Sequence, residues 1–291
     1  MNWIFLITAS VLSGSVAALL QRVLVRGKTA DTHAYSTLTQ LLSAGVSLIA
    51  AIILGRTSFP NLRSIIDNQV YLFVLLSAIL YTLNAIFCFR ALKFIEVSKF
   101  SVLYTTRAVV TIIVASIFLG ESLTSVQLLG SGLIIASILL LNTKSTKDLL
   151  KFGKGEVYAL IAALAFGVAT VSDKYIIEWF DFVPYLMLDF LLPALLLIMI
   201  KPRVVAEFKG LFSKKIFVPI LIFSSLYTLA AITFFGAMSS SDNTSLVSSV
   251  GQVSTISTVV LGIIFLKERK ELAKKVIAGV VSVFGLILLI I

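Results

Sequence analysis

Long apolar runs, separated by short polar and basic segments, follow one another along the whole chain. Each run is about 18 to 22 residues long, which suits an α-helix that crosses the roughly 30 Å hydrocarbon core of a bilayer. The pattern predicts an all-α membrane protein with ten transmembrane helices and with both termini on the same side of the membrane. The ten runs are 3–24, 35–54, 70–90, 98–118, 124–141, 156–177, 183–200, 216–237, 245–266 and 272–291.

The composition agrees with a membrane protein. Hydrophobic residues make up 59% of the 291 residues and charged residues only 13%, whereas about 25% of the residues in a soluble domain are charged. The first apolar run has no basic segment before it, as a cleaved signal peptide would have, so we expect it to remain as a span. The formal net charge of +10 comes from Lys and Arg residues between the runs. These positions indicate contact with anionic lipid headgroups rather than with nucleic acid.

The positions of the basic residues predict the orientation of the chain. Of the 24 Lys and Arg residues, all except Arg56, Arg63, Lys174 and Arg107 lie in or beside segments that follow an odd-numbered run. Loops rich in Lys and Arg stay on the cytoplasmic side of a membrane. We therefore expect the odd-numbered loops to be cytoplasmic and both termini to face outward, in a bacterial or archaeal plasma membrane.

The chain contains an internal repeat. Phe118–Glu121 and Phe265–Glu268 both read Phe-Leu-x-Glu at the end of a long apolar run. We predict that 1–142 and 156–291 are two five-helix repeats, joined by a basic cytoplasmic linker over 143–155. An odd number of helices in each repeat makes the two copies inverted, and a substrate site is expected at their interface near the bilayer midplane. The two motif glutamates are predicted to be N-terminal charges for the runs that follow them.

The same motif carries a resemblance to a known family. The pattern "FLGESLT..Q..G..L" at Phe118 to Leu133 recurs in a degraded form at Phe265 to Gly279. With the length and the two halves of five spans, it resembles the EamA-like transporters of the drug/metabolite transporter superfamily. The resemblance implies a secondary transporter, commonly an exporter of small metabolites or amino acids. Many relatives carry a proline in the fourth span, whereas this chain has none between Ser98 and Phe118.

Arg107 lies near the middle of the fourth run, 98–118. An arginine at the centre of a membrane helix costs about 2.5 to 3.5 kcal/mol on insertion scales, so we expect it to have a function. Three roles fit: a donor to an anionic or zwitterionic substrate, one half of a structural ion pair, or a side chain that snorkels to the headgroups. Alignment of the repeats pairs Arg107 with Ser254. Because the second repeat carries no charge there, the fold itself does not require one, and substrate recognition is favoured.

Polar side chains recur at helical spacing along the fourth run and along its counterpart, the ninth run. Lipid offers such groups no partners, so each stripe faces protein or a water-filled cavity. Serine and threonine also bond back to their own helix, so packing is the alternative for each hydroxyl taken alone. Together the two stripes predict a central cavity between the repeats. The candidate lining residues are Ser101, Tyr104, Arg107, Thr111, Ser248, Gln252 and Thr255.

Asp189, in the seventh run (183–200), is the second charged candidate. Measured from the same membrane face, it lies about five residues less deep than Arg107, which is roughly 7.5 Å of helix rise. Three roles are open for it: ion-pair partner of Arg107, binding site for a coupling proton, or structural group near a helix end. Pro184 and Pro193 predict that this run is bent.

Four further polar residues belong to other runs that border the expected cavity. Each has the alternative role of a satisfied contact between helices. These candidates are Gln40, Tyr81, Asn84 and Tyr227.

No motif in the chain indicates an enzyme. G-x-x-x-x-G-K-[ST], H-E-x-x-H and G-x-S-x-G are all absent, and the chain has one histidine and one cysteine, so we expect no cofactor and no metal site. The sequence predicts a secondary active transporter that exports a small metabolite, an amino acid or another anionic or zwitterionic solute, by alternating access, with the proton as a candidate coupling ion. The alternatives are an exporter of cationic drugs, a non-saturable channel and a non-transporting scaffold or receptor. Ten spans can enclose a path within one chain, so no oligomer is required.

Overall fold

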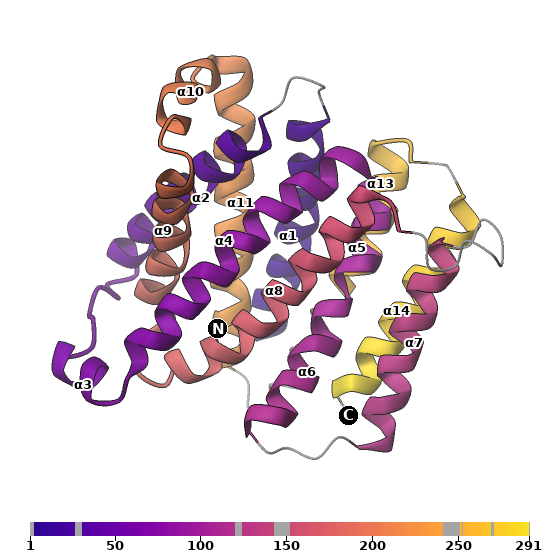
Figure 1. Ribbon diagram of the computed structural model, residues 1–291, viewed down its shortest axis with the longest axis horizontal. Helices are drawn as coiled ribbons and strands as arrows, with labels where there is room; N and C mark the ends of the chain where they lie inside the picture. The colour runs from indigo at the N-terminus through magenta and orange to yellow at the C-terminus, as the bar shows by residue number, and fades with distance from the viewer. Residues whose placement is uncertain are drawn as a thin grey trace.

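The chain forms a bundle of helices in the computed structural model (Figure 1). The structure describes residues 3–26, 31–119, 124–142, 152–240, 251, 253–268 and 271–290, and these contain helices and connecting segments but no strand. The first half holds α1 (Trp3–Val25), α2 (Thr32–Ile53), α3 (Leu62–Asp67), α4 (Val70–Phe94), α5 (Val97–Tyr104), α6 (Thr106–Leu119) and α7 (Ser125–Asn142). The second half holds α8 (Lys154–Ile176), α9 (Phe182–Ile200), α10 (Val204–Leu211), α11 (Lys214–Ser239), α13 (Val253–Phe265) and α14 (Leu272–Ile290).

Seven segments of the described residues are long and apolar enough to cross a bilayer. They are Trp3–Val25, Thr32–Ile53, Val70–Phe94, Val97–Phe118, Lys154–Ile176, Phe182–Ile200 and Lys214–Ala237. Two shorter apolar helices, Ser125–Leu140 and Val253–Phe265, fall within the predicted runs 124–141 and 245–266. The protein is therefore a multi-pass helical membrane protein, and the count of ten spans stays a prediction.

The helices pair across the two halves in a pattern that is unchanged when the halves are exchanged. The helix α4 packs along α8, and α1 packs along α11. Exchange of α1 with α8 and of α4 with α11 turns the first pairing into the second. In the same way, α6 against α8 becomes α13 against α1, while α2 against α9 and α7 against α14 map onto themselves. This pattern fits the predicted pair of five-helix repeats.

Ion pairs at the helix ends show which ends of the helices lie together. Lys99 Nζ lies 2.6 Å from Glu156 Oε1, so the start of α8 lies at the same end of the bundle as the start of α5. Lys201, after α9, lies 2.9 Å from Asp31, before α2. Helices α2 and α9 are equivalent in the repeat, and the start of one meets the end of the other. The two helices are thus antiparallel, as inverted repeats require.

The segments after even-numbered spans meet at the opposite end. The guanidinium of Arg56 lies 3.6 Å from the Asp181 carboxylate, and the Tyr175 hydroxyl donates to the Asn68 carbonyl over 3.0 Å. Figure 1 shows this separation, with α10 at the top and α3 at the bottom of the view. The basic and the less basic loops are thus segregated, while the side that faces the cytoplasm stays a prediction from charge.

Asp31 and Lys201 shift each other's pKa values. Burial on its own raises the pKa of Asp31, but hydrogen bonds from Lys201 and from the amides of Ala34 and His33 outweigh it and hold that pKa at about 2. The same carboxylate and that of Glu207 raise the pKa of Lys201 through hydrogen bonds. The connection after α9 is therefore tied to the start of α2.

Glu268 caps a helix of the other repeat. It is 5% exposed, and its carboxylate accepts hydrogen bonds from the amides of Val97 (2.9 Å) and Ser98 (3.0 Å) and from the Ser98 hydroxyl (2.6 Å). These amides open α5, where a helix has unpaired N–H groups and a positive dipole end. The prediction that Glu268 serves the helix after it is therefore wrong: α13 packs on α5, which brings the carboxylate to α5 before α14 begins at Leu272. Glu121 lies outside the described residues.

Candidate functional site

The fourth span is interrupted beside Arg107. Helix α5 ends at Tyr104 and α6 begins at Thr106, although no proline is present. The Thr105 hydroxyl donates to the Val102 carbonyl and the Thr106 hydroxyl to the Leu103 carbonyl, each over 2.6 Å. Threonine hydroxyls that bond to preceding carbonyls bend membrane helices. The break thus has a local cause, and it puts Arg107 in the first turn of α6.

The guanidinium of Arg107 lies against two aromatic rings. Its Cζ atom is 4.7 Å from the ring centroid of Tyr104 and 4.7 Å from that of Phe166 on α8. Such cation–π contacts stabilise a buried cation without using its N–H groups. Within the described part of the chain, no carboxylate lies within 4 Å of this guanidinium. Its donor edge is thus left without a protein acceptor there.

The Tyr104 ring is fixed from the other side by Asn84. The Asn84 side-chain amide donates to the Tyr104 hydroxyl over 2.7 Å and to the Ala162 carbonyl of α8 over 3.0 Å. Asn84 is buried, and it joins α4, α5 and α8 in one network. The aromatic platform under Arg107 is therefore held by three helices.

Helices α6 and α8 meet backbone to backbone next to Arg107. A Cβ atom placed on Gly167 would lie 2.6 Å from the Arg107 carbonyl oxygen and 2.8 Å from Val110 Cβ. The Thr111 hydroxyl donates to the carbonyls of both Arg107 and Gly167, each over 3.0 Å. Thr111 therefore stabilises the contact between these helices, and Gly167 makes room for it.

A buried carboxylate lies further along α8, the helix that carries Phe166. Asp173, near the end of α8, is 5% exposed and accepts hydrogen bonds from the hydroxyls of Ser77 (3.2 Å), Tyr81 (2.5 Å) and Tyr185 (2.6 Å). The Tyr81 ring stands edge-on to Phe166, with centroids 5.6 Å apart. Phe166 thus contacts both the Tyr81 ring, whose hydroxyl binds the acid, and the guanidinium of Arg107.

Sequence reasoning missed Asp173, Tyr185 and Phe166. Asp173 falls inside the predicted run 156–177, and an ionisable residue within a span is by itself a reason to expect function. Its proximity to the end of the run made it resemble an ordinary interfacial residue. Phe166 gave no signal, because a phenylalanine in an apolar run is unremarkable.

Asp189 lies near Asp173 rather than in contact with Arg107. The structure forms no ion pair between Asp189 and Arg107, and Asp189 Oδ1 is buried without a hydrogen-bond partner among the described residues. Asp189 follows Tyr185 by one helical turn on α9, and the Tyr185 hydroxyl donates to Asp173 over 2.6 Å, so the two acids are neighbours. Tyr227 on α11 packs against Phe190, the residue after Asp189, with ring centroids 5.6 Å apart.

The remaining candidates are dispersed over the bundle. Tyr227 stacks on Phe223, with ring centroids 5.7 Å apart. Thr255 is buried on α13, while Gln40 on α2 and Ser101 on α5 are half-buried. Ser248 and Gln252 lie outside the described residues, so the stripe of the ninth run is only partly visible. Among the described residues, no group of three or more His, Cys, Asp or Glu side chains is placed to hold a metal ion.

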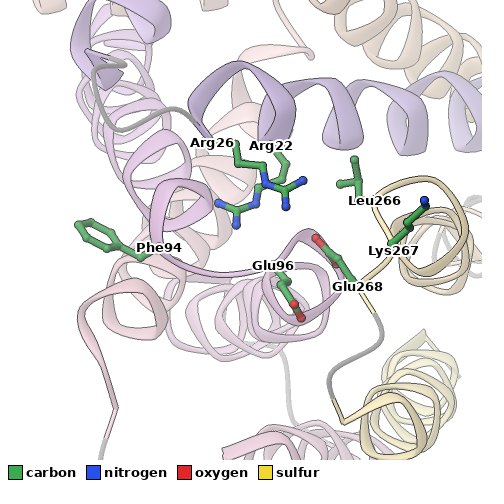
Figure 2. A pocket seen from close by; sticks show the side chains of 7 residues that line it. All are labelled: Arg22, Arg26, Phe94, Glu96, Leu266, Lys267 and Glu268. Atoms are coloured by element: carbon green, nitrogen blue, oxygen red, sulfur yellow. The ribbon is translucent and has the colours of Figure 1, made fainter.

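A cavity of about 440 Å³ opens at the end of the bundle that holds the odd-numbered loops. Figure 2 shows Arg22 and Arg26 reaching toward Glu96 and Glu268, with Phe94 to one side. Arg22 donates to the Leu92 carbonyl, Lys275 pairs with Glu96, and Glu268 caps α5. Arg22, Glu96 and Glu268 thus have protein partners, so we assign the cavity to the structure of this end. The seven lining residues are Arg22, Arg26, Phe94, Glu96, Leu266, Lys267 and Glu268.

Comparisons with known proteins agree with the helix pairing. The sequence model of the EamA-like transporter family matches residues 1–143 and again residues 153–291. The chain therefore belongs to the EamA-like transporter family, as the motif at Phe118 to Leu133 indicated. A crystal structure with 15% sequence identity superposes with a TM-score of 0.56, over 97% of this chain and 94% of its own, which supports the fold alone. No curated protein matches the sequence at a significant level.

Proposed function

We propose that this protein is a secondary active transporter that carries a small anionic or zwitterionic metabolite by alternating access between its two repeats, in the direction of export. Membership of a transporter family supports movement of a small molecule across the bilayer. The solute, its direction and the mechanism are inferred from the arrangement around Arg107.

The observation that carries the proposal is the position of the Arg107 guanidinium. The rings of Tyr104 and Phe166 hold it at 4.7 Å each, and no described carboxylate neutralises it. A planar guanidinium held in this way presents two parallel N–H groups, which fit a carboxylate or phosphate group. An anionic group of the substrate is the acceptor that this site lacks.

The helix break beside Arg107 supports a change of conformation. Residues at the ends of helical segments absorb the backbone rotation when a transporter rocks between states. The break at Thr105 lies directly before the proposed binding residue. Movement of α5 relative to α6 would therefore change the position of Arg107 relative to Tyr104.

The test is counterflow in liposomes that contain the purified protein. A panel of radiolabelled amino acids and small carboxylates is offered to vesicles loaded with the same unlabelled solute. A carrier shows saturable uptake driven by exchange, whereas a channel shows neither property. We expect Arg107→Ala to lower kcat/KM about 10- to 100-fold, because a hydrogen bond to a charged group contributes about 1.5–3 kcal/mol. Arg107→Lys keeps the charge but loses the paired N–H geometry, so we expect a partial loss.

Arg90→Ala is the matched control. Arg90 also stacks on an aromatic ring, with its Cζ atom 5.8 Å from the Phe87 centroid, but its side chain is exposed. Transport that is unchanged in Arg90→Ala and reduced in Arg107→Ala supports the proposal. Unchanged saturable transport in Arg107→Ala, or a preference for cationic solutes, contradicts it.

A further inference from the structure

We propose that Asp173 and Asp189 form one proton-binding site, and that the cationic group of a zwitterionic substrate displaces its proton during transport. This inference rests on the proposed function and deepens it, since it names the coupling ion and one chemical group of the substrate.

Asp173 is arranged as an ionised carboxylate. Three hydroxyl groups converge on it, from Ser77 and Tyr81 on α4 and from Tyr185 on α9, at 3.2, 2.5 and 2.6 Å. An ionised carboxylate accepts all three O–H donors, whereas a protonated one carries its own donor and loses acceptor capacity. The three hydroxyl groups therefore supply the stabilisation that lipid and apolar side chains do not.

Asp189 is arranged as a protonated carboxyl group. It follows Tyr185 by four residues on α9, so it lies one helical turn further along the same face. Its Oδ1 atom is buried, and no described group donates a hydrogen bond to it. An ionised carboxylate in such surroundings is strongly disfavoured unless a cation or a set of donors accompanies it. Tyr185, one turn away on the same helix, binds Asp173, and the three donors all go to Asp173, so we infer that the two neighbouring carboxyls hold one proton between them.

The titratable groups around the pair include no described basic partner. Helix α2 packs on α9 here through Ala44, and its own titratable residues His33 and Tyr35 lie at the other end, where His33 Nε2 is 2.9 Å from the Leu197 oxygen. Helices α4, α9 and α11 contribute hydroxyl groups only. The titratable groups that face the acids are Tyr81 on α4, Tyr185 on α9 and Tyr227 on α11.

The acid pair is close to the proposed anion site. Tyr81, which donates to Asp173, is 5.6 Å from Phe166 between ring centroids, and Phe166 is 4.7 Å from Arg107 Cζ, so the Tyr81 ring and the guanidinium are at most about 10 Å apart. On α4, Ser77, Tyr81 and Asn84 follow at helical spacing and link the two sites through their hydrogen bonds. In this proposal, a zwitterion that binds Arg107 through its carboxylate turns its ammonium group toward the acids.

Competition between the proton and the ammonium group gives exchange. When the substrate binds, its ammonium group replaces the proton as the cation that neutralises Asp189, and the proton leaves to the side that is open. When the substrate leaves, the buried carboxylate takes up a proton again. A gradient with more protons outside then drives substrate outward, which matches the proposed direction.

The first test uses the proton alone, without any substrate. Infrared difference spectra of the purified protein between acidic and basic pH report the C=O stretching band of a protonated carboxyl group. We expect one band from a buried carboxyl that is lost in Asp189→Asn and shifted in Tyr185→Phe, which removes a hydroxyl donor with little change of shape. Asp181→Asn is the control, because Asp181 caps the same helix and is partly exposed beside Arg56. A buried-carboxyl band that persists in both Asp189→Asn and Asp173→Asn overturns the site.

The second test measures coupling in liposomes that contain a pH-sensitive dye. Efflux of a solute identified by counterflow acidifies the lumen in the wild type, and the apparent affinity rises about tenfold per pH unit while the site titrates. In Asp189→Asn we expect exchange without proton movement, and loss of the preference for a zwitterion over its N-acetylated anion. Saturable, Arg107-dependent transport that moves no protons in the wild type, or that responds to a sodium gradient instead, contradicts this inference and leaves the proposed function intact.

Discussion

Two acids of this protein, Glu268 and Asp189, have opposite surroundings. Glu268, at the end of the bundle, accepts three hydrogen bonds from the start of α5 at 2.6 to 3.0 Å. Asp189, inside the bundle, has a buried oxygen with no donor among the described residues. The first charge completes a helix end and holds two repeats together. In the described part of the chain, this oxygen of Asp189 lacks a hydrogen-bond donor or a cation, and a bound ion or substrate can supply one.

The two arginines that can be compared show the same contrast. Arg22 donates to the Leu92 carbonyl and lies near Glu96 and Glu268. Arg107 has aromatic rings on its faces and, among the described residues, no carboxylate at its edge. Charged side chains that have protein partners serve the fold, whereas those inside the bundle without a described partner are the candidates for binding.

The largest expected effect on stability comes from Glu268→Ala. It leaves the amides of Val97 and Ser98 buried without an acceptor, so we expect a loss of about 3 kcal/mol in the free energy of unfolding. Thermal unfolding in detergent measures it, with Glu271→Ala as control, since Glu271 is 44% exposed and lies 3.6 Å from Lys274. If both variants melt alike, Glu268 is not the structural acid described here.

A smaller effect is expected from Gly167→Ala. The added methyl group would approach the Arg107 carbonyl to 2.6 Å and force α6 from α8, at a cost of about 2 kcal/mol. Because the contact lies beside the binding residue, we also expect a reduced affinity in the counterflow assay. Gly132→Ala on α7 meets nothing within 4 Å, so it should leave both quantities unchanged. Equal behaviour of the two variants would show that the approach of α6 and α8 is unimportant.

The smallest effect concerns Asp31, a partnered acid near the surface. Its pKa of about 2 is below the ordinary value of 3.8, so it stabilises the folded state above about pH 4 and loses this contribution as the pH falls through 2. The ion pair with Lys201 is about 40% exposed, so solvent screening limits the effect to less than about 1 kcal/mol. Melting temperatures measured from pH 5 to about 2 should converge for wild type and Asp31→Asn, with Asp67→Asn as an exposed control. A constant difference across that range would contradict the assigned role.

The helices could be predicted because bilayer crossing imposes a length and a composition. The predicted runs 3–24, 156–177 and 183–200 differ from α1, α8 and α9 by one or two residues. The short helices α3 and α10 were not predicted, since they are too brief to produce an apolar run. The break at Thr105 was not predicted either, because it arises from hydroxyl groups rather than from proline.

The candidate site was predicted only in part. Four of the residues that the structure brings together could be identified from the sequence, because each interrupts an apolar run with a polar group. They are Arg107, Tyr104, Asn84 and Tyr81. These residues belong to two neighbouring sites, which meet at Phe166. Which residue belongs to which site depends on helix rotation, and a single sequence does not specify that rotation. The partnership of Glu268 with α5 also needed the packing of one repeat on the other.

The central claim is that Arg107 binds an anionic group of the substrate, and ligand-dependent thermal stability tests it most directly. Purified wild type and Arg107→Ala are melted with and without the amino acids and carboxylates of the counterflow panel. At a ligand concentration of about 100 times Kd, binding adds about 2.7 kcal/mol to the free energy of unfolding, which is several degrees in Tm. We predict that one class of solute raises the Tm of the wild type, while the Tm of Arg107→Ala is the same with and without that solute. An equal gain in both proteins would contradict the claim.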